Sequence, residues 1–261
     1  IAVFDMGVAG AAIATGIGYA VPALVGLVYF TANRKSSLYI VKPEMNLSAI
    51  WKSCSNGASE MVTSLSASVV ALLMNNILMD LAGSAGVASF TIIMYAQGLL
   101  SATYMGYSFG VSPLISYNYG KQDIRRLKII YASSLKMIFI VSIVTFGVSL
   151  LLSNVLVGIF IPAGTWVFDL SVHGYRIFAF GFLFMGLNGF ASAMFTALND
   201  GRVSAILSFF RTLVFIVVAA LVLPSILGLN GVWLAIPLAE LLSIGMTIYY
   251  FKKMRPIYQY A

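Results

Sequence analysis

The chain has 261 residues, of which 61% are hydrophobic and 9% are charged, and its mean hydropathy is +0.97. Soluble domains have roughly 45–50% apolar and about 25% charged residues, so this composition excludes a soluble protein and indicates one whose solvent is lipid. The net charge of +7 does not indicate nucleic-acid binding, because the basic residues fall in short connections beside apolar stretches.

Seven continuous apolar stretches follow one another along the chain. They cover residues 8–30, 58–80, 86–110, 133–160, 176–198, 205–224 and 229–251. Most are close to the roughly 20 residues that cross the hydrocarbon core as a helix. A β-barrel is excluded, since its strands would be about 10 residues long with alternating polarity. The predicted fold class is therefore all-α, a polytopic helical membrane protein with seven transmembrane helices.

The basic residues occupy alternate connections between these stretches. They follow the first stretch (Arg34, Lys35, Lys42, Lys52), the third (Lys121, Arg125, Arg126, Lys128, Lys136), the fifth (Arg202, Arg211) and the seventh (Lys252, Lys253, Arg255). The other connections hold Arg176 together with Asp5, Asp80 and Asp169. This is the positive-inside pattern, and it predicts a multi-pass protein of the cell membrane whose C-terminus is cytoplasmic.

An internal repeat links the first stretch to the seventh. A shift of the sequence by about 220 positions aligns Gly7, Gly10, Ala14, Tyr29, Phe30 and Arg34 with Gly228, Gly231, Ala235, Tyr250, Phe251 and Arg255. Parallel repeats of this kind are typical of two-lobed transporters. We therefore expect residues 1–35 to be the last helix of a truncated N-terminal lobe, 36–56 a cytoplasmic linker and 57–261 a six-helix C-terminal lobe.

Several motifs resemble multidrug and toxic compound extrusion (MATE) transporters. The Gly-Val-Ala-Gly-Ala-Ala entry from Gly7 is similar to the start of that family's sixth helix. Ser-Pro-Leu-Ile-Ser-Tyr-Asn-Tyr-Gly at 112–120, with the basic run to Lys128, resembles the cytoplasmic loop in the middle of the second lobe. Asn-Asp-Gly-Arg at 199–202 and the segment 231–240 are also similar to bacterial members. By this resemblance the chain is the sixth helix and whole C-terminal lobe of a twelve-helix antiporter.

The resemblance implies a secondary active antiporter of the bacterial inner membrane. It would export drug-like organic cations in exchange for protons or sodium ions, with no cofactor. Its partners would be the lipid bilayer, the cationic substrates and the missing N-terminal lobe, which in the family holds an acidic coupling site. The sodium-coupled branch has an Asp in the fourth helix of this lobe. Here that helix has Asn188 and no acid, which disfavours a sodium site there.

Glu60 is the first candidate for ion or substrate binding. Ser64, Ser68 and Asn75 follow it at spacings that keep all four on roughly one face of a helix, as a polar stripe toward a cavity. Ionisable groups in lipid cost about 2.5–3.5 kcal/mol, so each needs an explanation. The alternative is that Glu60 lies at the membrane interface and stabilises a helix N-terminus.

Glu240 lies midway along the seventh stretch, three residues after Pro237. A central acid must be protonated, paired or hydrated, and the proline frees a carbonyl one turn earlier. A binding role is expected, with Arg211 as a possible partner. If the two are paired, the pair could instead hold the lobe together.

The remaining candidates are neutral. Gln97 and Asn188, like Asn75, are polar groups in apolar runs, and either ligand contacts or interhelical hydrogen bonds would explain them. The predicted cavity lining is Met94, Tyr95, Met105 and Tyr107, because such side chains suit bulky flat cations. No metal site is expected, since His173 is the only histidine and has no cluster of acids or cysteines near it in sequence.

Three rival functions would leave other marks in the sequence. A lipid-linked sugar flippase would favour more cationic residues in the cavity. A seven-helix receptor commonly ties its outer loops with a disulfide, which the single Cys54 cannot form. A membrane enzyme would need clustered histidines or paired acids at one depth. No ATP-binding Gly-rich motif occurs, so transport energy would have to come from an ion gradient.

Overall fold

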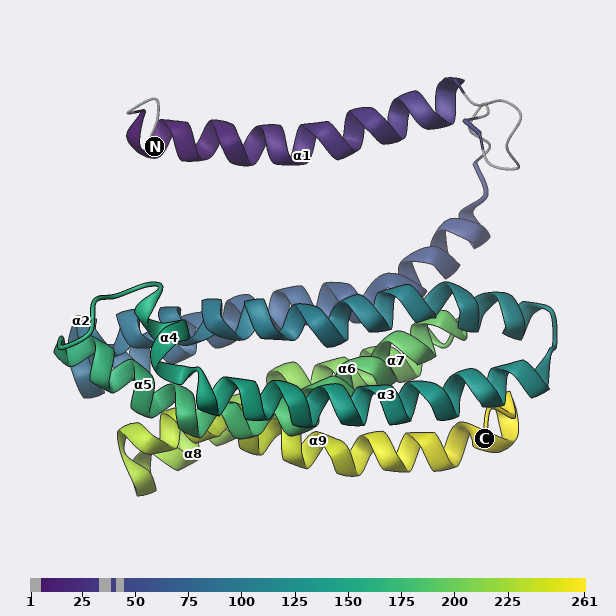
Figure 1. Cartoon of the computed structure of the whole chain (residues 1–261). Helices are drawn as coiled ribbons and strands as arrows, with labels where there is room; N and C mark the ends of the chain where they lie inside the picture. Colours follow the sequence, from purple (N-terminus) through teal and green to yellow (C-terminus); the bar gives the residue numbers. More distant parts are fainter. Residues whose placement is uncertain (1–5, 33–38, 41–44) are drawn as a thin grey trace. The chain divides into compact units, whose positions relative to one another are not determined.

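The computed structural model describes residues 6–32, 39–40 and 45–261, and these form helices joined by short connections (Figure 1). The chain divides into two compact units, residues 1–48 and 49–261. We describe each unit separately. Asp5, Arg34, Lys35 and Lys42 lie outside the described residues, as do positions 36–38 and 41–44 of the predicted linker.

The first unit contains α1, Gly7–Ala32, with Pro22 inside it. Its 26 residues reach about 39 Å at 1.5 Å per residue, which is enough to cross the hydrocarbon core. The helix agrees with the first predicted stretch, 8–30.

The second unit begins within α2, Leu47–Gly120, a helix that contains two of the predicted stretches. Gly83 divides it, because its φ of 61° and ψ of −152° are not helical. A residue without a Cβ adopts this left-handed φ at no steric cost. The chain therefore turns between 80 and 86, where the sequence predicted a connection. Asp80, expected near this turn, is exposed.

The other helices follow in chain order. They are α3 (Ile124–Leu151), α4 (Ser153–Gly158), α5 (Trp166–Phe178), the 3-10 turn η1 (Ala179–Gly181), α6 (Phe182–Ala197), α7 (Gly201–Phe209), the π-helical turn η2 (Phe210–Val214), α8 (Phe215–Leu227) and α9 (Leu229–Tyr258). α5, η1 and α6 run on as one apolar segment, and α7, η2 and α8 as another. When α2 is divided at Gly83, each predicted stretch corresponds to a described helical segment that is long and apolar enough to cross a membrane.

Several predicted boundaries were wrong. α3 ends at Leu151 and the short α4 at Gly158, whereas the predicted stretch ran to 160. The next apolar segment begins at Trp166 and not at 176. Asp123 caps the start of α3 by accepting a hydrogen bond from the Arg126 backbone, so the basic run from Arg125 is helical and not a loop. Hydropathy locates the hydrocarbon-spanning part of a helix, whereas caps decide where it ends.

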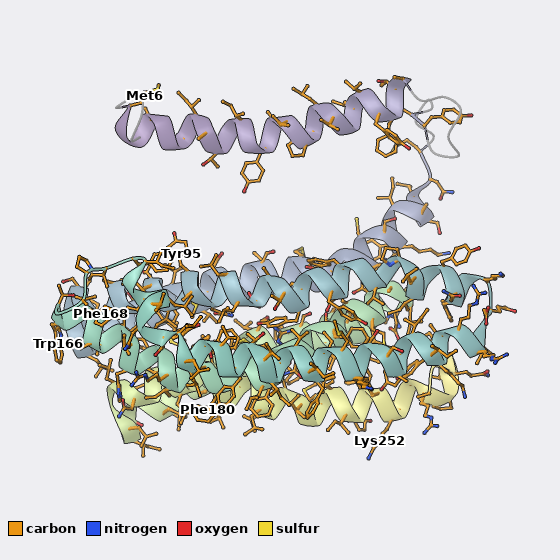
Figure 2. All side chains as sticks on the ribbon, in the orientation of Figure 1. Met6, Tyr95, Trp166, Phe168, Phe180 and Lys252 are labelled. Carbon is orange, nitrogen blue, oxygen red and sulfur yellow. The ribbon has the colours of Figure 1, made fainter. Side chains whose placement is uncertain are left out.

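Basic residues gather at one end of the second unit. The turn after α2 and the C-terminal end of α9 lie at this end (Figure 1). Tyr258 ties α9 to the start of α7, because its hydroxyl donates to Asp200 Oδ2 over 2.8 Å. Lys252 and Trp166 lie toward opposite ends of the bundle (Figure 2). The assignment of the basic end to the cytoplasm remains a prediction from the sequence.

The proposed repeat pairs Gly7 with Gly228. Gly7 begins α1 and Gly228 precedes α9, and each has a φ of 55°. Glycine adopts this positive φ freely, so the internal repeat between α1 and α9 stays a prediction from the sequence.

The core of the second unit centres on α6, which packs against α3, α7 and α9, while α8 packs against α9. Its largest fully buried side chains are aromatic, among them Tyr175, Phe182, Phe190, Phe195 and Trp233. These rings pack between the helices. Polar residues, among them Asn188 and Glu240, are also buried there and belong to the region of the candidate site.

Candidate functional site

A cavity of about 220 Å³ lies among α2, α6 and the α7–η2 segment. Its described lining combines one carboxylate, one guanidinium, aromatic rings, thioethers and hydroxyls. The lining residues are Glu60, Thr63, Gln97, Ser101, Tyr104, Met105, Ser108, Phe109, Met185, Gly189, Ser192, Ala193, Ser208 and Arg211. The volume is below the roughly 300–1,000 Å³ of sites that enclose a drug-sized ligand, so this cavity fits one end of such a ligand.

Glu60 is the cavity's acid. Its side chain is exposed, and no ion pair to it occurs among the described residues. The helix begins at Leu47, far before Glu60, so the alternative in which Glu60 stabilises a helix N-terminus is wrong. What remains is a solvent-accessible carboxylate that faces a partly apolar cavity.

Glu240 lies in a buried charge network on α9. Arg211 Nε donates to Oε1 over 2.9 Å, and Asn188 Nδ2 donates to Oε2 over 2.7 Å. Asn188 also donates to the Glu240 backbone carbonyl, and its own Oδ1 accepts from Thr247. Only 4% of Glu240 is exposed. Both carboxylate oxygens are thus held, and the predicted pairing with Arg211 is confirmed.

The π-helical turn η2 carries Arg211. A π turn adds a residue to the helix and rotates the following side chains, and such turns are frequent at functional sites. Arg211 lies three residues after Ser208, and both residues line the cavity. The guanidinium reaches Glu240 with Nε, and Arg211 is also one of the residues that line the cavity.

Two further groups in the cavity wall bind one thioether. Gln97 Nε2 lies 3.8 Å from the Met185 sulfur, and the Tyr104 hydroxyl donates to the same atom over 3.5 Å. Both contacts join α2 to α6. The predicted interhelical role of Gln97 is therefore present, although its partner is a weak acceptor.

A ladder of hydroxyls leads from the α6–α7 turn to the cavity. Thr196 Oγ1 lies 2.7 Å from Ser204 Oγ, which lies within hydrogen-bond distance of Ser192, and Ser192 lies 2.9 Å from Ser208. Either atom can donate in each of these contacts. The ladder joins the two helices closely and ends one turn below Arg211.

The structure separates the residues predicted from sequence into three groups. Glu60, Gln97 and Met105 line the cavity. Asn188 and Glu240 lie behind it in the charge network. Ser64, Asn75, Met94, Tyr95 and Tyr107 lie outside the cavity's described lining.

The third group has other surroundings. Ser64 is exposed, and Met94 packs half-buried against the core. Tyr95, near the end of the bundle that holds Trp166, stacks on Phe160 with 63% of its surface exposed (Figure 2). Tyr107 donates to Ser134 on α3.

Sequence reasoning missed much of the cavity wall. Tyr104, Phe109 and Met185 are the principal additions, with Ser192 and Ser208 beside them. Tyr104 and Ser108 lie seven and eleven residues after Gln97, so the face of a helix through Gln97 contained the signal for them. The contribution of α6 depends on tertiary packing alone.

The MatE family model matches residues 60–221, which is more than half of the chain. The chain belongs to the MatE family. Membership confirms the resemblance seen in the sequence, makes the chain part of a membrane transporter family and removes the seven-helix receptor. The matched segment contains Glu60, Asn188 and Arg211 but ends before Glu240.

Curated relatives in the family are bacterial. The chain is 27% identical over 266 residues to "Multidrug export protein MepA" of Staphylococcus aureus, covering 97% of the chain and 56% of that relative. It is 28% identical over 253 residues to the protein of the same name from Staphylococcus saprophyticus, covering 91% of the chain and 52% of that relative. The chain therefore spans little more than half the length of these relatives.

Solved structures share the fold. A crystal structure of MATE in complex with MaL6 superposes with a TM-score of 0.88 at 20% identity, covering 98% of the chain and 58% of that structure. The structure of the MATE multidrug transporter DinF-BH gives 0.84 at 28% identity, covering 98% and 57%. Both comparisons confirm an all-helical MATE fold.

Proposed function

We propose that this chain is part of a secondary antiporter that exports drug-like organic cations in exchange for protons or sodium ions. In this proposal residues 1–35 supply the last helix of one lobe, 36–56 a cytoplasmic linker and 57–261 the other lobe. Family membership and the multidrug export relatives support the export of drugs. The exchange for an ion and the preference for cations rest on the cavity.

The observation that carries the proposal is the placement of Glu60. It is an accessible carboxylate in a cavity whose other walls include the rings of Tyr104 and Phe109 and the thioethers of Met105 and Met185. Aromatic faces attract cations, and thioethers adapt to irregular apolar surfaces. A flat organic cation would therefore place its charge near Glu60 and its apolar body against these side chains.

The same carboxylate gives a mechanism for exchange. Glu60 can hold a proton, a sodium ion or a substrate cation, and each occupant weakens the attraction for the others. Binding of the ion on the outer side would favour release of the substrate there. Rocking of two lobes would expose the cavity to each side in turn, as in other transporters with internal repeats.

The network around Glu240 has a positioning role in this proposal. Its charge is neutralised by Arg211 and its oxygens are held, so Glu240 is less free than Glu60 to exchange ions. A flippase for lipid-linked sugars is not favoured. Among the described lining residues Arg211 is the only cation, and it is already paired.

The proposal is tested by ethidium transport into the lumen of inverted membrane vesicles, where the cytoplasmic face points outward. The vesicles contain the complete product of the gene encoding this chain. An imposed proton or sodium gradient should drive ethidium transport by the wild-type protein. Glu60→Gln should weaken ethidium binding about tenfold or more, equivalent to about 1.4 kcal/mol, and abolish the response to the gradient. Asp80→Asn is the matched control, because Asp80 is an exposed acid outside the cavity lining.

Two results would count against the proposal. Ethidium transport that neither gradient drives would reject antiport. Wild-type transport by Glu60→Gln would remove Glu60 from the mechanism and leave the family assignment intact.

A further inference from the structure

A groove of about 300 Å³ lies between α3 and α9, near the basic end of the second unit. The helix α6, which packs against both α3 and α9, contributes Leu187 to its lining. Two cations, Lys252 and Arg255, belong to the lining as well. The rest of the lining is chiefly apolar and includes Leu135, Ile248 and Phe251. We call this space the α3–α9 groove.

The α3–α9 groove lies on the side of α6 that faces away from the candidate cavity. Met185 and Gly189 of α6 line the cavity, whereas Leu187 lines the groove. At about 100° per residue, Leu187 points about 200° away from each of those two residues. The helices that flank the groove expose apolar side chains, among them Phe139 on α3 and Ile248 on α9. An exposed apolar surface of this kind on a membrane protein is covered by lipid.

The groove extends across the depth at which the apolar stretches end. Leu135 and Ile248 lie inside the stretches 133–160 and 229–251, and Lys252 directly follows the second of them. The rings of Tyr131 and Phe251 meet at this boundary with their centres 5.4 Å apart. Aromatic rings are enriched where hydrocarbon gives way to headgroups. The apolar part of the groove therefore lies at the depth of acyl chains, and its cations lie at the depth of headgroups.

Both cations have donors available for an anion. Among the described residues, none pairs with the Lys252 ammonium, and Arg255 uses only Nε, which donates to the Ala261 carbonyl over 2.7 Å. The next residue, Lys253, differs, because it lies 5.4 Å from the centre of the Tyr249 ring and outside the groove lining. Lys252 and Arg255 are three residues apart on one helix, so a single phosphate can contact both.

We propose that the α3–α9 groove binds one molecule of phosphatidylglycerol. Its phosphodiester contacts Lys252 and Arg255, and part of one acyl chain lies against Leu135, Leu187 and Ile248. Basic pockets between transmembrane helices are suited to anionic lipid headgroups. A headgroup that carries its own cation, as in phosphatidylcholine, would be repelled by the same two side chains. Two cations one turn apart match one phosphate, which favours phosphatidylglycerol over the two phosphates of cardiolipin. The lipid site is independent of the exported compound and of the coupling ion.

The test is native mass spectrometry of the complete gene product in detergent, titrated with lipid. The spectra resolve each bound lipid molecule and give the dissociation constant of the first one. Phosphatidylglycerol and phosphatidylcholine with the same acyl chains are compared, so the ratio of their constants isolates the charge of the headgroup. The wild-type protein should bind phosphatidylglycerol about tenfold or more tightly than phosphatidylcholine.

Lys252→Gln should lower this preference about fivefold, because one cation near the headgroup is lost. Lys253→Gln is the matched control, since it removes the same charge one residue away and should leave the preference within about twofold. Ile248→Trp fills the apolar part of the groove and keeps both cations, so it should weaken the binding of both lipids about fivefold or more. Its control is Leu242→Trp, an exposed position of α9 outside the groove lining.

A preference that falls in Lys252→Gln and not in Lys253→Gln supports the site. Equal losses in these two variants would show a general effect of surface charge and would overturn it. The site is also overturned if the wild-type protein binds both lipids equally, or if Ile248→Trp binds them as the wild-type protein does. Displacement of phosphatidylglycerol by soluble glycerol 3-phosphate, or by cardiolipin at equal phosphate concentration, would reject phosphatidylglycerol as the occupant.

Discussion

Removal of one partner from the Arg211–Glu240 pair should destabilise the protein far more than removal of both. Glu240→Leu leaves Arg211 without its carboxylate inside the bundle, and Arg211→Met leaves a carboxylate whose side chain is 6% exposed. Breaking a buried pair in this way costs about 3–5 kcal/mol. Arg211 borders the cavity, where water can reach it, so we expect about 3 kcal/mol for Glu240→Leu and somewhat more for Arg211→Met.

The double variant should be much milder. Two apolar side chains replace the pair, and Asn188 keeps its hydrogen bonds to the backbone carbonyl of residue 240 and to Thr247. Replacement of a buried pair by apolar groups is often close to neutral, so we expect a loss of about 1 kcal/mol. The pair is therefore expected to show a coupling free energy of about 5 kcal/mol, within the range measured for close charge pairs.

The assay is the free energy of unfolding in mixed micelles titrated with dodecyl sulfate, followed by tryptophan fluorescence. Trp233, fully buried on α9, reports on this region. Arg125→Met is the control, because Arg125 is an exposed cation on α3, and it should change stability by less than about 0.5 kcal/mol. If the double variant lost the sum of the two single losses, the pair would not be a coupled buried unit and the reasoning would be wrong.

Three further predictions concern packing, capping and topology. Gly231→Ala should destabilise the protein by about 1–3 kcal/mol in the same unfolding assay, because the added Cβ would overlap the Leu223 carbonyl. Gly245→Ala, which has open space around it, should be neutral or stabilise by up to about 1 kcal/mol. Equal effects of the two substitutions would contradict this packing. Asp200→Ala should lower stability by about 1–2 kcal/mol, because Asp200 caps α7 through the Val203 backbone and accepts a hydrogen bond from the Tyr258 hydroxyl. Tyr258→Phe should cost less, because the cap survives. If Tyr258→Phe lowered the melting temperature more than Asp200→Ala, the cap would not be the larger effect. In a Cys54→Ser background, Lys253→Cys should react with a membrane-impermeant maleimide only from the cytoplasmic side and His173→Cys only from outside; the opposite labelling would invert the predicted topology.

The sequence could predict everything that depends on transfer from water to lipid. Each apolar stretch identifies a membrane-crossing segment without knowledge of its neighbours, because the free energy of insertion depends mainly on the residues of that segment. The sequence also predicted a repeat between α1 and α9, whose paired glycines Gly7 and Gly228 have the same φ. The division of the chain into lobes and the cytoplasmic side of the C-terminus stay predictions.

Helix ends were less predictable. The caps at Asp123 and Asp200 show why, because a side chain that bonds to a backbone N–H sets where a helix begins irrespective of hydropathy. The family resemblance placed the charged run after Asp123 in a cytoplasmic loop, but the run is part of α3.

The sequence predicted only part of the site, and it did not predict how those residues are arranged. Polarity in an apolar run identified Glu60, Gln97, Asn188 and Glu240, because each such group needs an explanation wherever it points. Only tertiary structure decided that Glu60 faces a cavity while Glu240 is enclosed by Arg211 and Asn188. The reason is physical. Hydropathy reports the free energy of burial in lipid, which is the same on every face of a helix. The packing of α6 and α9 against the π turn η2 selects which faces meet.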